Sequence, residues 1–189
     1  MKSKVRSLSA TAKLFGWLLV QEPDQDLLAS LRDAPLRQAF AHLDIQVPTD
    51  DLTLAQVIDQ FRECFSGRQQ STPLLQSLWV TESNEGPVAE LRKRAAAAEL
   101  ELDPEAGTPV DHLGSILQLW AHFADSWPEH AAGIATHHLP WAHAPLARVA
   151  RHDSFYGQLA AATAALIQQI LAATDADAGT DENPATGGE

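Results

Sequence analysis

The sequence is poor in cysteine and in basic residues. Its single cysteine, Cys64, excludes an internal disulfide and fits a reducing compartment. Thirteen Lys and Arg residues stand against 25 Asp and Glu, which gives a formal net charge of −12 at pH 7. Because phosphate binding requires Lys and Arg, we expect no nucleic-acid partner, whereas a basic peptide would be attracted.

The sequence also lacks a long apolar run, since none approaches the ~20 residues of a membrane span. The first residues are basic and then apolar, as in a secretion signal. However, Lys13 interrupts the apolar stretch, and QEPDQD stands where a small-residue cleavage site should be. Leu8, Ala12, Phe15 and Leu19 mark one helical face. We therefore expect the first helix of a cytoplasmic protein without stable membrane insertion.

Two-residue alternation is absent, while helical periodicity recurs along most of the chain. This predicts an all-α protein, a single globular bundle of about eight to ten helices in two lobes joined by a hinge. The polar stretch ELDPEAG places the N-terminal lobe at 1–104 and the C-terminal lobe at 105–174. The tail 175–189 carries five acids and no base, and we expect it to be disordered.

Several residues predict where helices begin. Pro23 and Pro35 suit first helical positions, and Asp50 or Asp51 can cap the helix that follows them. Asp153 or Ser154 can likewise cap the last helix, because Asp and Ser side chains are favoured N-caps.

An apolar loop at 68–83 departs from the usual polarity of loops, because it contains Leu74, Leu75, Leu78 and Trp79. Such a loop is either tucked into the core or exposed for a partner.

An acid and an imidazole, Asp111 and His112, stand side by side in TPVDHLGSILQLW. Thr108 as N-cap, Pro109 at the first position and Asp111 at the third predict a helix start, which accounts for Asp111 but not for His112. Catalysis would need a nucleophile or a phosphate-binding glycine loop, and neither pattern is present. The helix that follows buries a broad apolar face, so its first turn should lie in a cleft between the lobes, a preferred place for binding.

Histidine, a common metal ligand, is frequent in the C-terminal half, where it could form a metal site. Zinc sites on helices place ligands at i and i+4, so that both imidazoles share a face. That spacing is found in no pair drawn from His112, His122, His130, His137, His138 and His143.

Three ordered stretches resemble one protein family. TPVDHLGSILQLWAHFAD resembles the P-x-D-H-[LI]-G-x-x-L signature of the TorD/DmsD (NarJ-related) redox-enzyme maturation chaperones. TPLLQSLWVTES is similar to their apolar loop, and HHLPWAHAPLARVARHDSFYGQLAAATAAL to their H-L-x-P-W segment and last helix. The sequence departs from the family pattern at Leu75, which is usually aromatic, at Glu99, usually glycine, and at Ile116, often acidic.

The resemblance implies a cytoplasmic chaperone, not an enzyme, that binds the precursor of a molybdenum-cofactor oxidoreductase through its twin-arginine leader or its apo form. It would assist cofactor insertion and prevent premature export. We expect no cofactor, although some members of the family are linked to weak guanine-nucleotide binding. Others are linked to domain swapping, so the resemblance implies a monomer or a domain-swapped dimer. A metal-dependent helical hydrolase using the C-terminal histidines is the alternative.

A twin-arginine leader has a basic start and an apolar body, so its complement is an apolar groove with a carboxylate at one end. We expect Asp111 to accept an arginine at the lip of this groove, and His112 to bond the peptide backbone or to orient Asp111. The predicted signal-peptide site consists of Leu74, Leu75, Leu78, Trp79, Pro109, Asp111, His112, His138, Leu139, Pro140 and Trp141.

Overall fold

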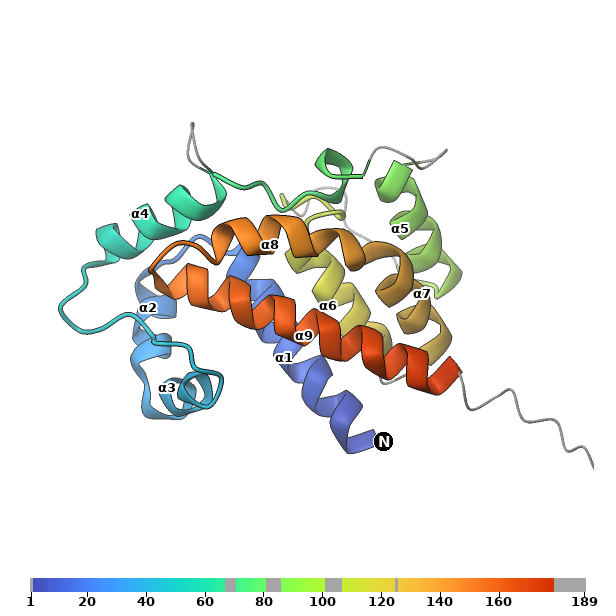
Figure 1. Cartoon of the computed structure of the whole chain (residues 1–189), viewed down its shortest axis with the longest axis horizontal. Helices are drawn as coiled ribbons and strands as arrows, with labels where there is room; N and C mark the ends of the chain where they lie inside the picture. Colours follow the sequence, from blue (N-terminus) through green and yellow to red (C-terminus); the bar gives the residue numbers. More distant parts are fainter. Residues whose placement is uncertain (1, 67–70, 81–85, 101–106, 125, 179–189) are drawn as a thin grey trace, which may run out of the picture.

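The structure, a computed structural model, describes residues 2–66, 71–80, 86–100, 107–124 and 126–178. Within these ranges it is all-helical and has no β-strand, as predicted (Figure 1). Its elements are α1 (Lys2–Val20), α2 (Gln25–Arg32), α3 (Ala34–Ala41), α4 (Leu54–Phe65), η1 (Gln76–Leu78), α5 (Gly86–Ala97), α6 (Leu113–Ala124), α7 (Pro128–His138), η2 (Pro140–Ala142), α8 (His143–Val149) and α9 (Phe155–Ala178).

Helices α1, α6 and α9 form the centre of the molecule. The N-terminal helix α1 packs along α6 and α9, and α9 also contacts α4, α7 and α8. Figure 1 shows α2, α3 and α4 at one end and α5 and α7 at the other. The buried residues of both predicted lobes form one apolar cluster, so the chain is a single helical domain. The hinge between the lobes stays a prediction, because residues 101–106 lie outside the described ranges.

The pairing of α1 with α6 depends on two glycines at their crossing. A Cβ on Gly114 would collide with the carbonyl oxygen of Gly16, and a Cβ on Gly16 would lie 2.6 Å from the carbonyl oxygen of Gly114. Farther along the pair, the Ser9 hydroxyl donates to the Ala121 carbonyl over 3.0 Å. These contacts show that the helices are antiparallel and place the start of α6 against Gly16.

Most helix starts differ from their predicted caps. Helix α2 is capped by Asp24, whose side chain accepts from the Leu27 N–H, so Pro23 precedes the cap. Helix α4 is capped not by Asp50 or Asp51 but by Thr53, in a capping box with Gln56. A capping box satisfies two unpaired N–H groups, whereas a single cap satisfies one.

Two further helices also begin or end away from the predicted residues. Helix α6 begins at Leu113, four residues after Pro109, so Thr108 is not its N-cap. Helix α9 extends beyond Thr174 to Ala178, so the predicted disordered tail is wrong for residues 175–178, and its remainder lies outside the described residues. Ser154 does cap α9, because its hydroxyl accepts from the Gly157 N–H at 3.2 Å.

Helix α9 is long and apolar enough to cross a membrane, with a mean hydropathy of 1.3 over Phe155–Ala176. Core helices of globular proteins meet the same criterion. The buried residues of α9 recur at helical spacing and belong to the apolar cluster, as Leu159, Ile167 and Ile170 show. This pattern is that of a core helix with one face in the protein.

Candidate functional site

The apolar loop is joined to the start of α6 by backbone hydrogen bonds. Leu75 and His112 form an isolated antiparallel bridge. On either side of it, the Leu113 N–H donates to the Leu74 carbonyl over 2.8 Å, and the Gln76 N–H donates to the Asp111 carbonyl over 3.0 Å. Two stretches that the sequence singled out separately therefore lie side by side.

The Asp111 carboxylate lies beneath η1 and is only 2% exposed. Its Oδ2 accepts from the backbone N–H of Ser77 at 3.0 Å. A charged acceptor strengthens such a bond, and a buried N–H without a partner would be costly. Asp111 therefore holds η1 in place. Its binding of an arginine stays a prediction.

His112 is the residue immediately before α6 and caps that helix with its ring. Nδ1 accepts from the Gly114 N–H at 3.1 Å. Burial lowers the pKa of His112 to about 4, so the ring is neutral at pH 7 and Nδ1 is free to accept. A neutral ring also avoids the unfavourable interaction of a cation with a helix N-terminus. Capping by the neutral ring explains why a histidine stands at position 112, which the sequence pattern alone did not explain.

Gln76 connects the loop to the third predicted stretch. Its Oε1 accepts from His138 Nδ1 at 3.0 Å, and its Nε2 donates to the His137 carbonyl over 3.4 Å. The Gln76 side chain is buried. Sequence reasoning missed this residue, although a lone amide inside the apolar run LLQSLW was the available signal, because a buried amide needs specific partners.

A charged pair lies behind His138. His138 Nε2 is 3.9 Å from Glu90 Oε1, which forms an ion pair with Arg94 at 2.8 Å. Burial lowers the pKa of His138 to about 4, and the hydrogen bond from Arg94 lowers the pKa of Glu90. The guanidinium packs on Gly133, where a Cβ would displace it. Helices α5 and α7 are thereby linked under the loop.

The predicted site residues divide into three layers by exposure. Leu74, Asp111, His138 and Leu139 are buried, Leu75, Trp79, His112 and Trp141 are half-buried, and Leu78, Pro109 and Pro140 are exposed. The loop is therefore both tucked in and exposed, since Leu74 is 2% and Leu78 61% exposed.

Both tryptophans of the site are oriented by hydrogen bonds. Trp79 Nε1 donates to the Pro73 carbonyl over 2.9 Å, and Trp141 Nε1 donates to the His138 carbonyl over 2.8 Å. Arg148 lies over the Trp79 ring at 5.8 Å. Each indole thus has its polar atom satisfied and presents part of its ring to solvent, as expected of aromatic residues at binding surfaces.

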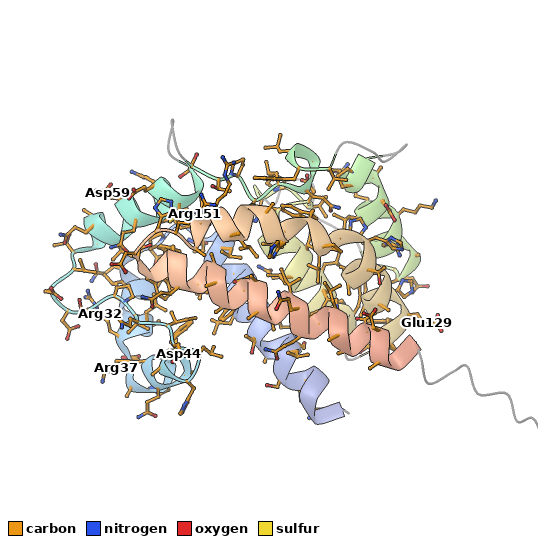
Figure 2. The ribbon with its side chains drawn as sticks, in the orientation of Figure 1. Arg32, Arg37, Asp44, Asp59, Glu129 and Arg151 are labelled. Atoms are coloured by element: carbon orange, nitrogen blue, oxygen red, sulfur yellow. The ribbon has the colours of Figure 1, made fainter. Side chains whose placement is uncertain are left out.

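A small apolar hollow adjoins this layer at Pro140. It has a volume of 220 Å³ and lies between α8 and α9, where Leu146, Ile167 and Leu171 line it. A larger cleft of 710 Å³ lies elsewhere, at the α2–α3 end of the molecule, where Figure 2 shows Arg32, Arg37 and Asp44.

The histidines of the C-terminal half are dispersed. Among the residues that the structure describes, no three His, Cys, Asp or Glu side chains gather as a metal ion would require. His112 and His138, the two at the site, each use Nδ1 in a hydrogen bond within the protein.

Comparison with known protein families shows to which family the chain belongs. Residues 29–162 match the family described as nitrate reductase delta subunit. This chain belongs to that family. The match spans α2 to the first third of α9 and therefore includes every residue of the candidate site. A search of curated proteins returned no match.

Membership in the nitrate reductase delta subunit family confirms the resemblance to NarJ-related redox-enzyme maturation chaperones. The family consists of soluble cytoplasmic chaperones that partner molybdoenzyme subunits during maturation, and it is not known for catalysis. Guanine-nucleotide binding and the oligomeric state stay predictions.

Proposed function

We propose that this protein is a chaperone that binds the twin-arginine leader of a molybdenum-containing oxidoreductase, holds the apo form during cofactor insertion and prevents premature export. The binding surface is the exposed layer of the site, with Leu78, Trp79, Pro109, Pro140 and Trp141. The proposal rests above all on one observation, the rigid display of Leu78 at 61% exposure on a turn that Asp111 fixes.

The apolar body of a leader suits this surface. An exposed leucine held by a rigid turn loses little conformational freedom when it is covered, so most of its burial contributes to binding. The hollow beside Pro140 provides a second apolar contact, since Leu146, Ile167 and Leu171 line it. Two apolar contacts separated by ordered tryptophans fit an extended or helical apolar segment better than a small compact ligand.

The basic start of the leader suits the charge of the chain, which has a net charge of −12. Asp111 contributes through the position of η1, and it binds an arginine directly only where the Ser77 N–H is released.

A matched pair of leucines tests the surface. Leu78→Ala should weaken binding of a synthetic leader, two adjacent arginines followed by an apolar segment, by about 5- to 30-fold, because about 1–2 kcal/mol of burial is lost. Leu43→Ala is the control, since Leu43 is also exposed, at 43%, but lies directly after α3, away from the site. Titration of the labelled peptide with each variant measures both. Equal affinities in the two variants would remove η1 from the binding surface.

The client can be found with the intact chain as bait. Pull-down from cell extract followed by mass spectrometry should recover an apo-oxidoreductase subunit, and Leu78→Ala should recover less of it. Recovery of the fully loaded enzyme alone would contradict a role before cofactor insertion.

A further inference from the structure

The α1–α6 pair differs in charge from the rest of the chain. Helix α1 contains Lys2, Lys4, Arg6 and Lys13 and no acid, and α6 contains neither Asp nor Glu. All 25 acids and nine of the 13 bases lie elsewhere in the sequence. An acidic protein thus carries two neighbouring helices that together contain four bases and no acid.

The exposed positions of the two helices form one continuous face. On α1, Arg6, Lys13 and Trp17 are exposed and recur at helical spacing. On α6, Gln118 and His122 are exposed one turn apart, and Gln118 lies against Gly16, with its Cγ 3.0 Å from the position of a Cβ there. Because the helices are antiparallel and cross at Gly16 and Gly114, both exposed stripes lie on the same side of the seam.

Two exposed tryptophans border this face. The large apolar side chains that the structure describes as exposed are Trp17, Leu43, Leu78 and Trp127, so both indoles in this set belong here. Trp17 is 44% and Trp127 42% exposed, and the His122 ring stacks on Trp127 with centroids 5.8 Å apart. We call Arg6, Lys13, Trp17, Gln118, His122 and Trp127 the α1–α6 face.

The basic side chains of the face are available to a partner. No carboxylate that the structure describes forms an ion pair with Arg6 or Lys13. By contrast, Arg32, Arg62 and Arg94 are each paired with an acid. Along the chain, the described acid nearest to Lys13 is Glu22, which lies nine residues away, beyond the end of α1.

We propose that the α1–α6 face docks this protein reversibly on a membrane surface that contains anionic lipids. Exposed Lys and Arg are attracted to anionic headgroups, and tryptophan prefers the headgroup level of a bilayer, where its ring is buried and its N–H stays hydrated. The face combines both residue types. The acids elsewhere are repelled, which favours the orientation that turns the α1–α6 face toward the surface. This function is separate from leader binding, because the face shares no residue with the candidate site.

Vesicle flotation with the full chain tests the proposal. We expect the protein to float with vesicles of phosphatidylcholine and phosphatidylglycerol, and not with phosphatidylcholine alone, at about 0.1 M salt, where charges act over about 10 Å. The double variant R6E/K13E should lose at least about tenfold in vesicle affinity, since each base near an anionic surface contributes independently. Trp17→Ala should weaken binding in a way that added salt does not remove.

A variant with the same change of net charge serves as the control. R92E/K93E reverses two exposed bases of α5, outside the face, and should bind vesicles nearly as well as the unaltered chain. Circular dichroism confirms that each variant is folded, and leader titration should give the same affinity for R6E/K13E as for the unaltered chain. No flotation with anionic vesicles, binding by R6E/K13E equal to that of the unaltered chain, or an equal loss in R92E/K93E would each overturn the proposal. None of these results would bear on leader binding.

Discussion

At the scale of single residues, Asp111 would act in the proposed leader-binding site by positioning the loop. The residue is buried and accepts the Ser77 N–H. Its side chain therefore determines where η1 lies, and η1 determines where Leu78 is displayed. A residue in such a place affects binding through the geometry of the loop.

Removing this acceptor should destabilise the fold. Asp111→Ala leaves the Ser77 N–H without its partner and should lower the free energy of unfolding by about 1–3 kcal/mol. Asp59→Ala, an exposed acid on α4 (Figure 2), should change it by less than about 0.5 kcal/mol. Urea denaturation measures both. An Asp111→Ala protein as stable as the Asp59→Ala protein would show that the loop is held by other contacts.

The two buried imidazoles predict how stability depends on pH. Burial lowers the pKa of both His112 and His138 to about 4 in the folded protein, whereas an unfolded histidine has a pKa of about 6.5. Between these values the unfolded chain binds more protons, so stability is full above pH 6.5, falls as the pH drops toward 4, and receives no further loss from these groups below that.

A variant that keeps the N-cap of α6 but has no titratable ring separates the contribution of His112 from that of His138. His112→Asn retains an acceptor for the Gly114 N–H but has no ring to protonate. Between pH 6.5 and 4 its free energy of unfolding should therefore fall less steeply than that of the unaltered chain, and the two slopes should differ by up to about 1.4 kcal/mol per pH unit. His42→Asn, at an exposed histidine, should keep the slope of the unaltered chain. Urea denaturation across this range gives the slopes. Equal slopes in all three proteins would show that His112 titrates normally when folded.

At the scale of the element, the end of α5 contains a residue in an unfavourable conformation. Glu99 has a φ of 56°, in the left-handed region, and the Leu100 N–H donates to the Ala95 carbonyl over 3.0 Å across the turn. The related chaperones usually have glycine here, which the structure explains, because glycine adopts this conformation without a steric cost.

Glycine at this position should stabilise the protein. Glu99→Gly removes the Cβ from a left-handed residue and should raise the free energy of unfolding by about 0.5–1 kcal/mol, after the added freedom of the unfolded chain is subtracted. Glu99→Ala keeps the Cβ and should bring no gain. Thermal denaturation of the two variants tests the difference, and stabilisation by alanine equal to that by glycine would assign the effect to the lost charge.

Helix content could be predicted from the sequence, whereas helix starts mostly could not. The spacing of Leu8, Ala12, Phe15 and Leu19 gave a face that is buried as expected, since burial follows periodicity. Caps depend on which side chain reaches a free N–H. Thr53 displaced Asp50 and Asp51 because Gln56 completes a second bond, and His112 caps α6 because burial keeps it neutral.

The site was predictable in part for a similar reason. Three stretches were recognised from local patterns, but their meeting at Gln76 depends on tertiary contacts with His137 and His138. The approach of α1 to α6 could not be predicted from the sequence either. Gly16 and Gly114 are 98 positions apart, and neither glycine by itself indicates a helix crossing.

At the scale of the whole molecule, charge is distributed so that the two proposed functions need not interfere. The candidate site belongs to a chain with a net charge of −12, and it shares no residue with α1, whose four charged residues are all basic. A basic leader and an anionic surface therefore attract different parts of the protein. A chaperone docked through α1 would keep the loop at 72–80 open to its client.

This distribution predicts that salt slows the capture of the leader more than it speeds the release. Long-range attraction between an acidic body and a basic peptide raises the association rate constant, and ions screen it, whereas the apolar contacts at Leu78 govern dissociation. Raising the salt from about 0.05 to 0.5 M should lower the association rate constant by about tenfold or more and change the dissociation rate constant by less than about threefold. Stopped-flow mixing of the labelled leader with the full chain separates the two constants. Leu78→Ala should raise the dissociation rate constant at every salt concentration and leave the association rate constant, with its dependence on salt, unchanged. An association rate constant that does not respond to salt would mean that the net charge of −12 has no part in recognition.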